Sequence, residues 1–460
     1  MSTMNPPGCM PGIRAVTMLV FALLVAVGCA QHSIQGQGAR ATQQWVGTWF
    51  ASPTARTDPP GGSRQGGAPP ANPATAALPP AVQASAPGQV LAVGAQSPLH
   101  FRNQTLRQIA HLSLGGTSLR VVFSNVFGTR PLTAGAAHVA LRTTGAAIAT
   151  GSNRALTFGG KATAIIPAGE TLASDPVTLT VPDFADLAID LYLPDDTAAM
   201  QSPLTIHPAS WQTNYVSTPG NHAGAATLPV QTTTAYRRTD GLVTATWFFL
   251  ARVEVMAPAQ TGVVVTLGDS LTDGTASTID TNSRWPNHLA RLLVEGGPRM
   301  AVLNAGIGGN RILVEGTGPS ALARFDRDVL SQPGVSHVVV FEGINDIGQA
   351  RGNPAPSADD LIAAHRQLID RAHARGLRIF GATLTPFEGA GYWTAEGEAK
   401  RQALNTWIRT SRAYDAFFDF DAVVRDPARP STVLGKYDAG DRLHLNAAGY
   451  EAIANAIDLA

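Results

Sequence analysis

The chain has 460 residues, and its 33 Lys and Arg balance 33 Asp and Glu, so the formal net charge is zero. This balance argues against a dedicated nucleic-acid-binding protein, which needs a basic surface to displace counterions from phosphates. Apolar residues make up 44% of the chain, enough for a core and against wholesale disorder, and the length predicts two or three domains.

The N-terminus has the pattern of an export signal. Residues 15–28 form an uncharged, largely apolar run, and Arg14 is the only basic side chain before it. A helix that crosses a bilayer needs about 20 apolar residues, so this shorter run fits the hydrophobic region of a signal peptide. The run ends before Cys29 in a sequence (AVGC) that resembles a bacterial lipobox; a cut after Ala30 is the alternative.

We therefore expect residues 1–29 to be a signal peptide, with lipidation at Cys29 as the only membrane attachment. The protein is expected to be exported, either as a lipoprotein of the outer membrane or cell surface or to the periplasm or medium. The only cysteines, Cys9 and Cys29, lie in this segment, so no disulfide, thiolate metal site or cysteine nucleophile is expected in the mature chain.

Residues 30–97 are expected to be a tether. Between residues 58 and 88, eight Pro and five Gly occupy 31 positions without apolar periodicity, which is typical of a disordered excursion. The short apolar segment WVGTW at 45–49 precedes it and is expected to pair as a strand with a folded part.

Residues 98–260 have the alternation that is typical of antiparallel strands. Short runs with a period of two are separated by Gly, Pro, Asn or Asp, and helical patterns are scarce. The spacing predicts an all-β, sandwich-like domain. The expected strands cover 105–114, 118–125, 136–143, 176–181, 186–194 and 247–255.

From residue 261 to residue 460, short apolar runs alternate with helical patterns. This order predicts right-handed βαβ units, a parallel sheet covered on both faces, and a ligand site at the carboxyl ends of its strands. The expected strands cover 263–267, 301–304, 337–342, 377–383 and 416–420, and the expected helices cover 285–295, 320–331, 358–375, 395–412 and a segment after Asn446.

Residue types that acyl transfer needs follow these strands in order. Ser270 lies in GDSL directly after the first strand, where backbone N–H groups can face an oxyanion. Glycines in NAGIGGN (304–310) permit close approach of the backbone to a substrate, and Asn345 after the third strand can donate an amide hydrogen. His444 can accept the serine proton, and Asp441 can hold its tautomer. Each element alone is more typical of a turn or cap, but the ordered set predicts acyl transfer.

This ordered set resembles the GDSL, or SGNH, hydrolase family over about residues 261–460. The resemblance implies a three-layer, flavodoxin-like α/β domain with ester hydrolase activity and without a metal or cofactor. It implies a triad of Ser270, His444 and Asp441, and an oxyanion hole of the Ser270 and Gly309 N–H groups with the Asn345 amide. Gly309 is preferred to Gly308 because the family spacing from Asn304 is Asn-x-x-x-x-Gly.

The first half of the chain extends the resemblance. WVGTW, FRNQTLRQ, SNVFGTRPL and GNH are similar to a subgroup of bacterial secreted GDSL enzymes that carry a β-rich domain before the hydrolase. That subgroup is associated with esterases related to xylan-degrading systems. The similarity in this half is looser than in the hydrolase half, and it does not identify a substrate.

The expected function is therefore a secreted or lipid-anchored serine esterase that acts on an acylated carbohydrate or another small ester. The absence of G-x-S-x-G disfavours the α/β-hydrolase family, and the chain has no H-E-x-x-H zinc motif. Two alternatives stay open: a carbohydrate-binding surface protein with a vestigial hydrolase domain, and an O-acyltransferase that uses the same triad. The sequence decides neither the acyl and alcohol groups nor the oligomeric state.

Overall fold

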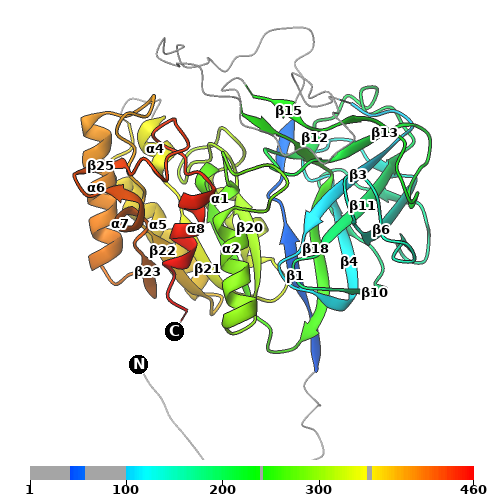
Figure 1. The fold of residues 1–460 in the computed structure, drawn as a ribbon, viewed down its shortest axis with the longest axis horizontal. Helices are drawn as coiled ribbons and strands as arrows, with labels where there is room; N and C mark the ends of the chain where they lie inside the picture. Colours follow the sequence, from blue (N-terminus) through cyan, green and yellow to red (C-terminus); the bar gives the residue numbers. More distant parts are fainter. Residues whose placement is uncertain (1–41, 57–99, 239–241, 350–354, 460) are drawn as a thin grey trace, which may run out of the picture. The chain divides into compact units, whose positions relative to one another are not determined.

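The computed structural model describes residues 42–56, 100–238, 242–349 and 355–459, which belong to one compact unit, Thr42–Ala460. The signal-peptide segment with Cys29 and the Pro- and Gly-rich stretch lie outside the described residues. Figure 1 shows a strand-rich part followed along the chain by a part in which strands and helices alternate.

The N-terminal part contains two antiparallel sheets that share one buried hydrophobic cluster. Alternation along β4 buries Leu119, Val121 and Phe123, and Ile189 of β11 joins the same cluster from the other sheet. The first sheet comprises β1 (Gln43–Phe50), β18 (Leu250–Pro258), β4 (Gly116–Ser124) and β10 (Val177–Val181) in that order, with β9 (Thr171–Ala173) beside β4. The second comprises β14 (Val230–Thr233), β13 (Tyr215–Pro219), β3 (Gln104–His111), β11 (Asp186–Leu193), β6 (Ala136–Leu141) and β7 (Arg154–Leu156). The expected sandwich-like architecture is confirmed.

The single strand expected over 247–255 is divided in two. Phe249 has a φ of 56°, which interrupts the extended backbone. The residues before it form β17 (Thr246–Phe248), and the residues after it form β18. β17 belongs to a small antiparallel sheet with β12 (Leu204–Pro208) and β2 (Thr54–Arg56). The β-rich part also contains two short pairs, β5 (Leu132–Ala134) with β8 (Ala164–Ile166) and β15 (Tyr236–Arg237) with β16 (Val243–Thr244).

The C-terminal part is built on a five-stranded parallel sheet. Its order is β20–β19–β21–β22–β23, which is the flavodoxin-like order in which the first strand lies beside both the second and the third. The strands are β19 (Val263–Gly268), β20 (Ala301–Gly306), β21 (Val335–Phe341), β22 (Arg378–Ala382) and β23 (Ala416–Phe418). The chain therefore reverses its direction of travel across the sheet at β19, where a ligand site is expected.

Helices cover both faces of this sheet. Right-handed crossovers place α2 on one face, where it packs against α8 (Figure 1), and place α3, α5 and α6 on the other face. The helices are α1 (Ser270–Asp273), α2 (Trp285–Arg291), α3 (Ala321–Phe325), α4 (Ile344–Gly348), α5 (Ala358–His373), α6 (Ala395–Thr410), α7 (Phe420–Val424) and α8 (Ala447–Asn455). A short hairpin, β24 (Arg425–Asp426) with β25 (Arg429–Val433), follows α7.

Two of the expected helices change their hydrogen bonding before they end. The helix expected over 285–295 continues from α2 into a π-helical turn, Leu292–Gly296, and the helix expected over 320–331 continues from α3 into Asp326–Leu330. The three-layer arrangement that the sequence predicted is nevertheless present. No helix within the described ranges is both long enough and apolar enough to cross a membrane.

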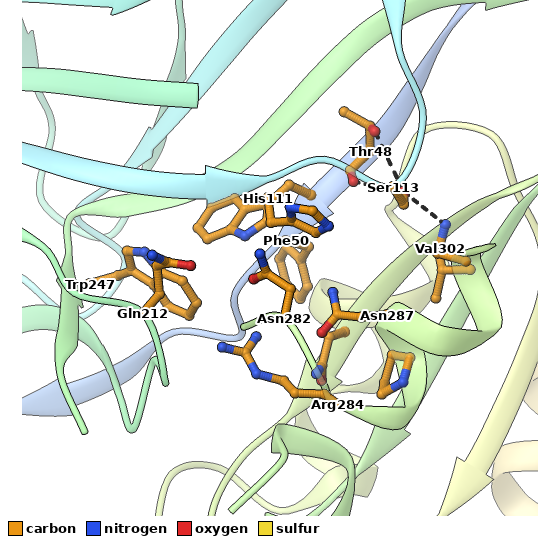
Figure 2. A pocket seen from close by; sticks show the side chains of 14 residues that line it. Thr48, Phe50, His111, Ser113, Gln212, Trp247, Asn282, Arg284, Asn287 and Val302 are labelled. Atoms are coloured by element: carbon orange, nitrogen blue, oxygen red, sulfur yellow. Dashed lines mark hydrogen bonds between the residues drawn. The ribbon is translucent and has the colours of Figure 1, made fainter. Parts of the chain in front are cut away.

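The β-rich part covers one edge of the parallel sheet. The hydroxyl of Ser113 accepts the N–H of Val302 on the edge strand β20 at 3.0 Å and donates to the carbonyl of Thr48 at 2.8 Å (Figure 2). Gly47 of β1 packs so closely that a Cβ there would lie 2.8 Å from Leu303 Cδ1. The glycine in WVGTW therefore permits β1 to cover an edge that would otherwise expose unpaired backbone groups.

Candidate active site

Ser270 lies at the carboxyl end of the central strand β19. The strand ends at Gly268, where a Cβ would overlap both Thr272 and the carbonyl oxygen of Phe341. This glycine allows α1 to begin directly after the strand. Asp269 caps the helix, since its Oδ1 accepts the N–H of Leu271 at 2.9 Å. Ser270 is thereby fixed in the first helical turn, where backbone N–H groups point toward the end of the sheet.

His444 and Asp441 come from the loop before α8. Asp441 Oδ1 accepts the N–H groups of Leu443 at 3.0 Å and His444 at 2.8 Å, which closes the loop into a tight turn. Asn446 caps α8 by accepting the N–H of Gly449 at 3.0 Å. The loop that carries the histidine is therefore held at both of its ends.

One chain of hydrogen bonds joins the three side chains of the predicted triad. Asp441 Oδ2 lies 2.5 Å from His444 Nδ1, and His444 Nε2 lies 2.9 Å from Ser270 Oγ. With Nδ1 donating to the carboxylate, Nε2 is the nitrogen available to accept the serine proton. The fold thus brings together Ser270 and His444, which are 174 positions apart in the chain.

The electrostatics of the loop keep Asp441 ionised. Burial by itself would raise the pKa of Asp441, but the hydrogen bond and charge of His444 oppose it, together with the N–H groups of His444 and Leu443. The resulting pKa lies well below the ordinary value of an aspartate. A carboxylate that stays ionised can stabilise the imidazolium formed when the histidine takes a proton.

The glycines after β20 differ in what their N–H groups contact. The N–H of Gly308 donates to Asp273 Oδ2 at 3.1 Å. Among the described residues the N–H of Gly309 has no acceptor, and Gly309 has a φ of 75°. The N–H of Ser270, in the first turn of α1, likewise has no acceptor in the described part of the chain. This contrast favours Gly309 over Gly308 as a donor to a bound substrate.

Asn345 is oriented by a network around its amide. It lies in the first turn of α4, after Gly343, whose φ is 122°. Its Oδ1 accepts from Gln349 Nε2 at 2.8 Å and from Tyr392 Oη at 3.4 Å, while its Nδ2 donates to the carbonyl of Asn310 at 3.1 Å. The amide nitrogen therefore faces the loop that carries Gly309 and keeps one further hydrogen for another acceptor.

Arg324 lies beneath this loop and was not among the residues predicted from the sequence. Its guanidinium donates to the carbonyls of Gly268 at 3.0 Å and Ala305 at 2.6 Å, and to Asn310 Oδ1 at 3.0 Å. The side chain is fully buried. It ties the ends of β19 and β20 to the loop that follows β20, although in the sequence it has the pattern of an ordinary arginine on a helix.

Three buried carboxyl groups lie near the site. Burial raises the pKa of Asp269 to about 7 and that of Asp346 to about 6, and it raises the pKa of Glu342 well above its ordinary value. Arg324 lies 4.0 Å from Glu342 and opposes the shift of that residue and of Asp269. Asp269 and Asp346 therefore change protonation near neutral pH. Within the described ranges no three His, Cys, Asp or Glu side chains are placed to hold a metal ion.

The comparisons with known proteins concern the C-terminal part. Residues 266–452 match the family model of the GDSL-like lipase/acylhydrolase family, and this part of the chain belongs to that family. No curated protein matches the chain.

Several solved structures match 42–43% of this chain. A putative lipolytic GDSL protein from Desulfitobacterium hafniense is 18% identical, and the match covers 43% of this chain and 97% of that chain with a TM-score of 0.34. The aryl esterase of M. smegmatis is 17% identical, with 43% and 96% covered and a TM-score of 0.36. An acetylxylan esterase from Geobacillus stearothermophilus is 22% identical, with 42% and 91% covered and a TM-score of 0.33.

Proposed function

We propose that this protein is a serine hydrolase of carboxylic esters. The observation that carries the proposal is the hydrogen-bond chain from Asp441 through His444 to Ser270. In the first half-reaction His444 Nε2 takes the proton of Ser270 Oγ, which attacks the ester carbonyl. The imidazolium then protonates the leaving alcohol, and an acyl-enzyme remains.

The second half-reaction uses the same groups. His444 removes a proton from water, the hydroxide attacks the acyl carbonyl, and the acid leaves as the proton returns to Ser270 Oγ. In both halves the negative oxygen is stabilised by the N–H groups of Ser270 and Gly309 and by the Asn345 amide. Loss of one such donor typically lowers turnover about 100- to 1000-fold.

We propose an acylated carbohydrate or another small, uncharged ester as the substrate class. The zero net charge gives the protein no general attraction for polyanions. The Asp441 side chain is 49% exposed, so this end of the triad lies at the surface. A panel of acetylated xylan, feruloyl esters and triglycerides tests this proposal, and exclusive turnover of long-chain triglycerides would contradict it.

Replacement of the nucleophile tests the reaction itself. Ser270→Ala is expected to lower hydrolysis of p-nitrophenyl acetate at least about 1000-fold, because the remaining groups cannot form the acyl-enzyme. The release of p-nitrophenol measures it. Ser336→Ala is the matched control, since Ser336 also contacts a histidine, His337, at 2.8 Å but lies at the start of β21, the opposite end from the site. Equal rates for wild type and Ser270→Ala would refute the assignment.

We further propose that the protein is exported and carries a lipid at Cys29, as the sequence of its first residues indicates. In the native host, the wild-type protein is expected in the detergent phase after Triton X-114 extraction. Cys29→Ser is expected to lose that partition, because the thiol that accepts the lipid is absent. Wild-type protein in the aqueous phase, with an N-terminus beyond residue 29, would instead support the cut after Ala30.

A further inference from the structure

A buried histidine of the β-rich part reaches the site through Asp273. His207 lies on β12, and its Nε2 is 3.1 Å from Asp273 Oδ1. The other carboxylate oxygen of Asp273 accepts the N–H of Gly308 at 3.1 Å. The side chains of His207 and Asp273 are 4% and 3% exposed. His207, from the first half of the chain, therefore fixes Asp273. Asp273 in turn holds Gly308, the residue before Gly309.

The second ring nitrogen of His207 is also engaged. Nδ1 lies 2.8 Å from the carbonyl oxygen of Ser52, which follows β1. Both ring nitrogens therefore have a hydrogen-bond partner. The imidazole thus has a fixed orientation between Ser52 and Asp273.

Ser52 also takes part in a second link to the same loop. Its hydroxyl accepts a hydrogen bond from Arg324 Nη1 at 3.2 Å, and Arg324 Nε donates to Asn310 Oδ1 at 3.0 Å. Ser52 is fully buried. The loop 306–310 is therefore anchored on Gly308 through Asp273 and on Asn310 through Arg324. Gly309 lies between these two anchors.

The β-rich part also holds the segment that follows the nucleophile. Asp280 accepts from Gln212 Nε2 at 2.7 Å and from the N–H of Thr213 at 2.6 Å, and Arg284 donates to the carbonyl of Ser210. Beside these contacts lies the small cavity of Figure 2, into which Gln212, Trp247 and Arg284 project. Its volume of about 30 Å³ accommodates about two water molecules.

We propose that the β-rich part completes the hydrolase site and that His207 is a positioning residue for the oxyanion hole. It acts through Asp273 on the loop that presents the Gly309 N–H. The proposal rests on the proposed function, because it assigns Gly309 to the oxyanion. A donor that must meet a developing charge within a few tenths of an ångström loses much of its effect when its loop relaxes.

Two amide substitutions separate the two contacts of His207. The amide nitrogen of a Gln side chain reaches about as far as Nε2 of a histidine, so His207→Gln is expected to keep the hydrogen bond to Asp273. The amide nitrogen of an Asn side chain reaches only about as far as Nδ1 of a histidine. His207→Asn is therefore expected to keep the hydrogen bond to Ser52 and to lose the one to Asp273. With p-nitrophenyl acetate, we expect kcat to fall about 10- to 100-fold in His207→Asn and less than about threefold in His207→Gln, with KM unchanged in both.

Binding of a transition-state analogue provides an independent readout. A boronic acid forms a tetrahedral adduct on the nucleophile, so its inhibition constant is expected to rise in His207→Asn by the same factor as kcat falls. His138→Ala is the matched control, because His138 contacts Asn153 at 3.0 Å within the β-rich part. This control is expected to leave kcat and boronate affinity unchanged.

Each result decides between the proposals. If His207→Asn and His207→Gln both match wild type in kcat, His207 does not position the site. If both lower the melting temperature while kcat is preserved, its role is confined to stability and the inference is likewise wrong. If wild type is inactive or Ser270→Ala is as active as wild type, the proposed function itself fails. If His207→Asn does not fold, Ser52→Ala tests the other link of the β-rich part to the same loop, and it is expected to lower kcat about three- to tenfold through loss of the Arg324 contact. Wild-type kcat in Ser52→Ala would then contradict the proposal that the β-rich part completes the site.

Discussion

Asp269 and Asp441 are two aspartates of one site in opposite electrostatic settings. Asp441 is surrounded by donors, and its pKa lies well below the ordinary value. Burial raises the pKa of Asp269 to about 7, and the hydrogen bond from Leu271 and the charges of His444 and Arg324 only partly offset it. Asp441 is suited to stabilise an imidazolium, whereas Asp269 is an N-cap whose charge is costly above neutral pH.

This difference predicts how stability changes with pH. A carboxyl whose folded-state pKa lies above its unfolded value stabilises the fold at low pH, and that stabilisation is lost as pH rises from about 4 to about 7. Asp269→Asn keeps an acceptor for Leu271 without a titratable group. We expect the decrease in unfolding free energy between pH 5 and pH 8 to shrink by about 2 kcal/mol in this variant.

Urea denaturation at both pH values measures this effect. Asp326→Asn is the control, because the Asp326 side chain is 76% exposed and pairs with Arg371 on the surface. It should leave the pH dependence of stability as in wild type. Parallel curves for wild type and Asp269→Asn would contradict the prediction.

At the scale of elements, the turns that leave the carboxyl edge of the sheet position the reacting groups. β19 passes into α1 with one capping residue between them, and β21 passes into α4 through Gly343. The φ of 122° at Gly343 lies in a region that L side chains rarely adopt. A Cβ there would meet Leu404 at 3.6 Å, an ordinary contact, so the requirement for glycine comes from the backbone.

Gly343→Ala should therefore disturb Asn345 through the backbone. We expect a loss of about 1–2 kcal/mol in unfolding free energy from strain and about a tenfold decrease in kcat as the amide moves. Gly376→Ala is the control, because Gly376 after α5 has a φ of 70° and open space around it. It should lose similar stability without a change in kcat. A decrease in kcat of the same size in both variants would show that strain alone affects the site.

At the scale of the whole molecule, the two halves are joined through buried polar contacts. The β-rich part covers the edge strand β20, and His207 and Ser52 reach the loop behind the nucleophile. Separation of the halves would remove His207 from Asp273 and Ser52 from Arg324, and the loss of partners for buried charged groups is costly. The two parts should therefore depend on each other for stability.

We accordingly expect one cooperative unfolding transition. All described helices lie between residues 270 and 455, so ellipticity at 222 nm reports mainly the C-terminal part. Four of the seven tryptophans lie in the β-rich part, Trp45, Trp49, Trp211 and Trp247, so fluorescence reports both parts. The midpoints of the two signals in urea should coincide. Two resolved transitions would show that the halves fold independently.

Much of the architecture of the C-terminal half can be inferred from the sequence alone. The parallel strands and most helices follow from alternation of apolar runs with helical periods, and Ser270, Asn345 and His444 each lie where a strand or loop meets the carboxyl edge of the sheet. These features are local, because the period of a segment and the residue after a strand can be identified without knowledge of distant partners. The break of the predicted strand at Phe249 was missed, because a positive φ at a phenylalanine has no compositional signal.

The contacts between the β-rich half and the site depend on long-range packing. His207 lies 155 positions from Ser52 and 66 from Asp273, and Ser52 lies 272 positions from Arg324. In the sequence each of these is an isolated polar residue without a motif. Their contacts depend on how two sheets and a three-layer domain pack together, and packing over such separations is not encoded in any local pattern. The apolar content indicates that the chain can form a core, and tertiary packing joins its two halves around one loop.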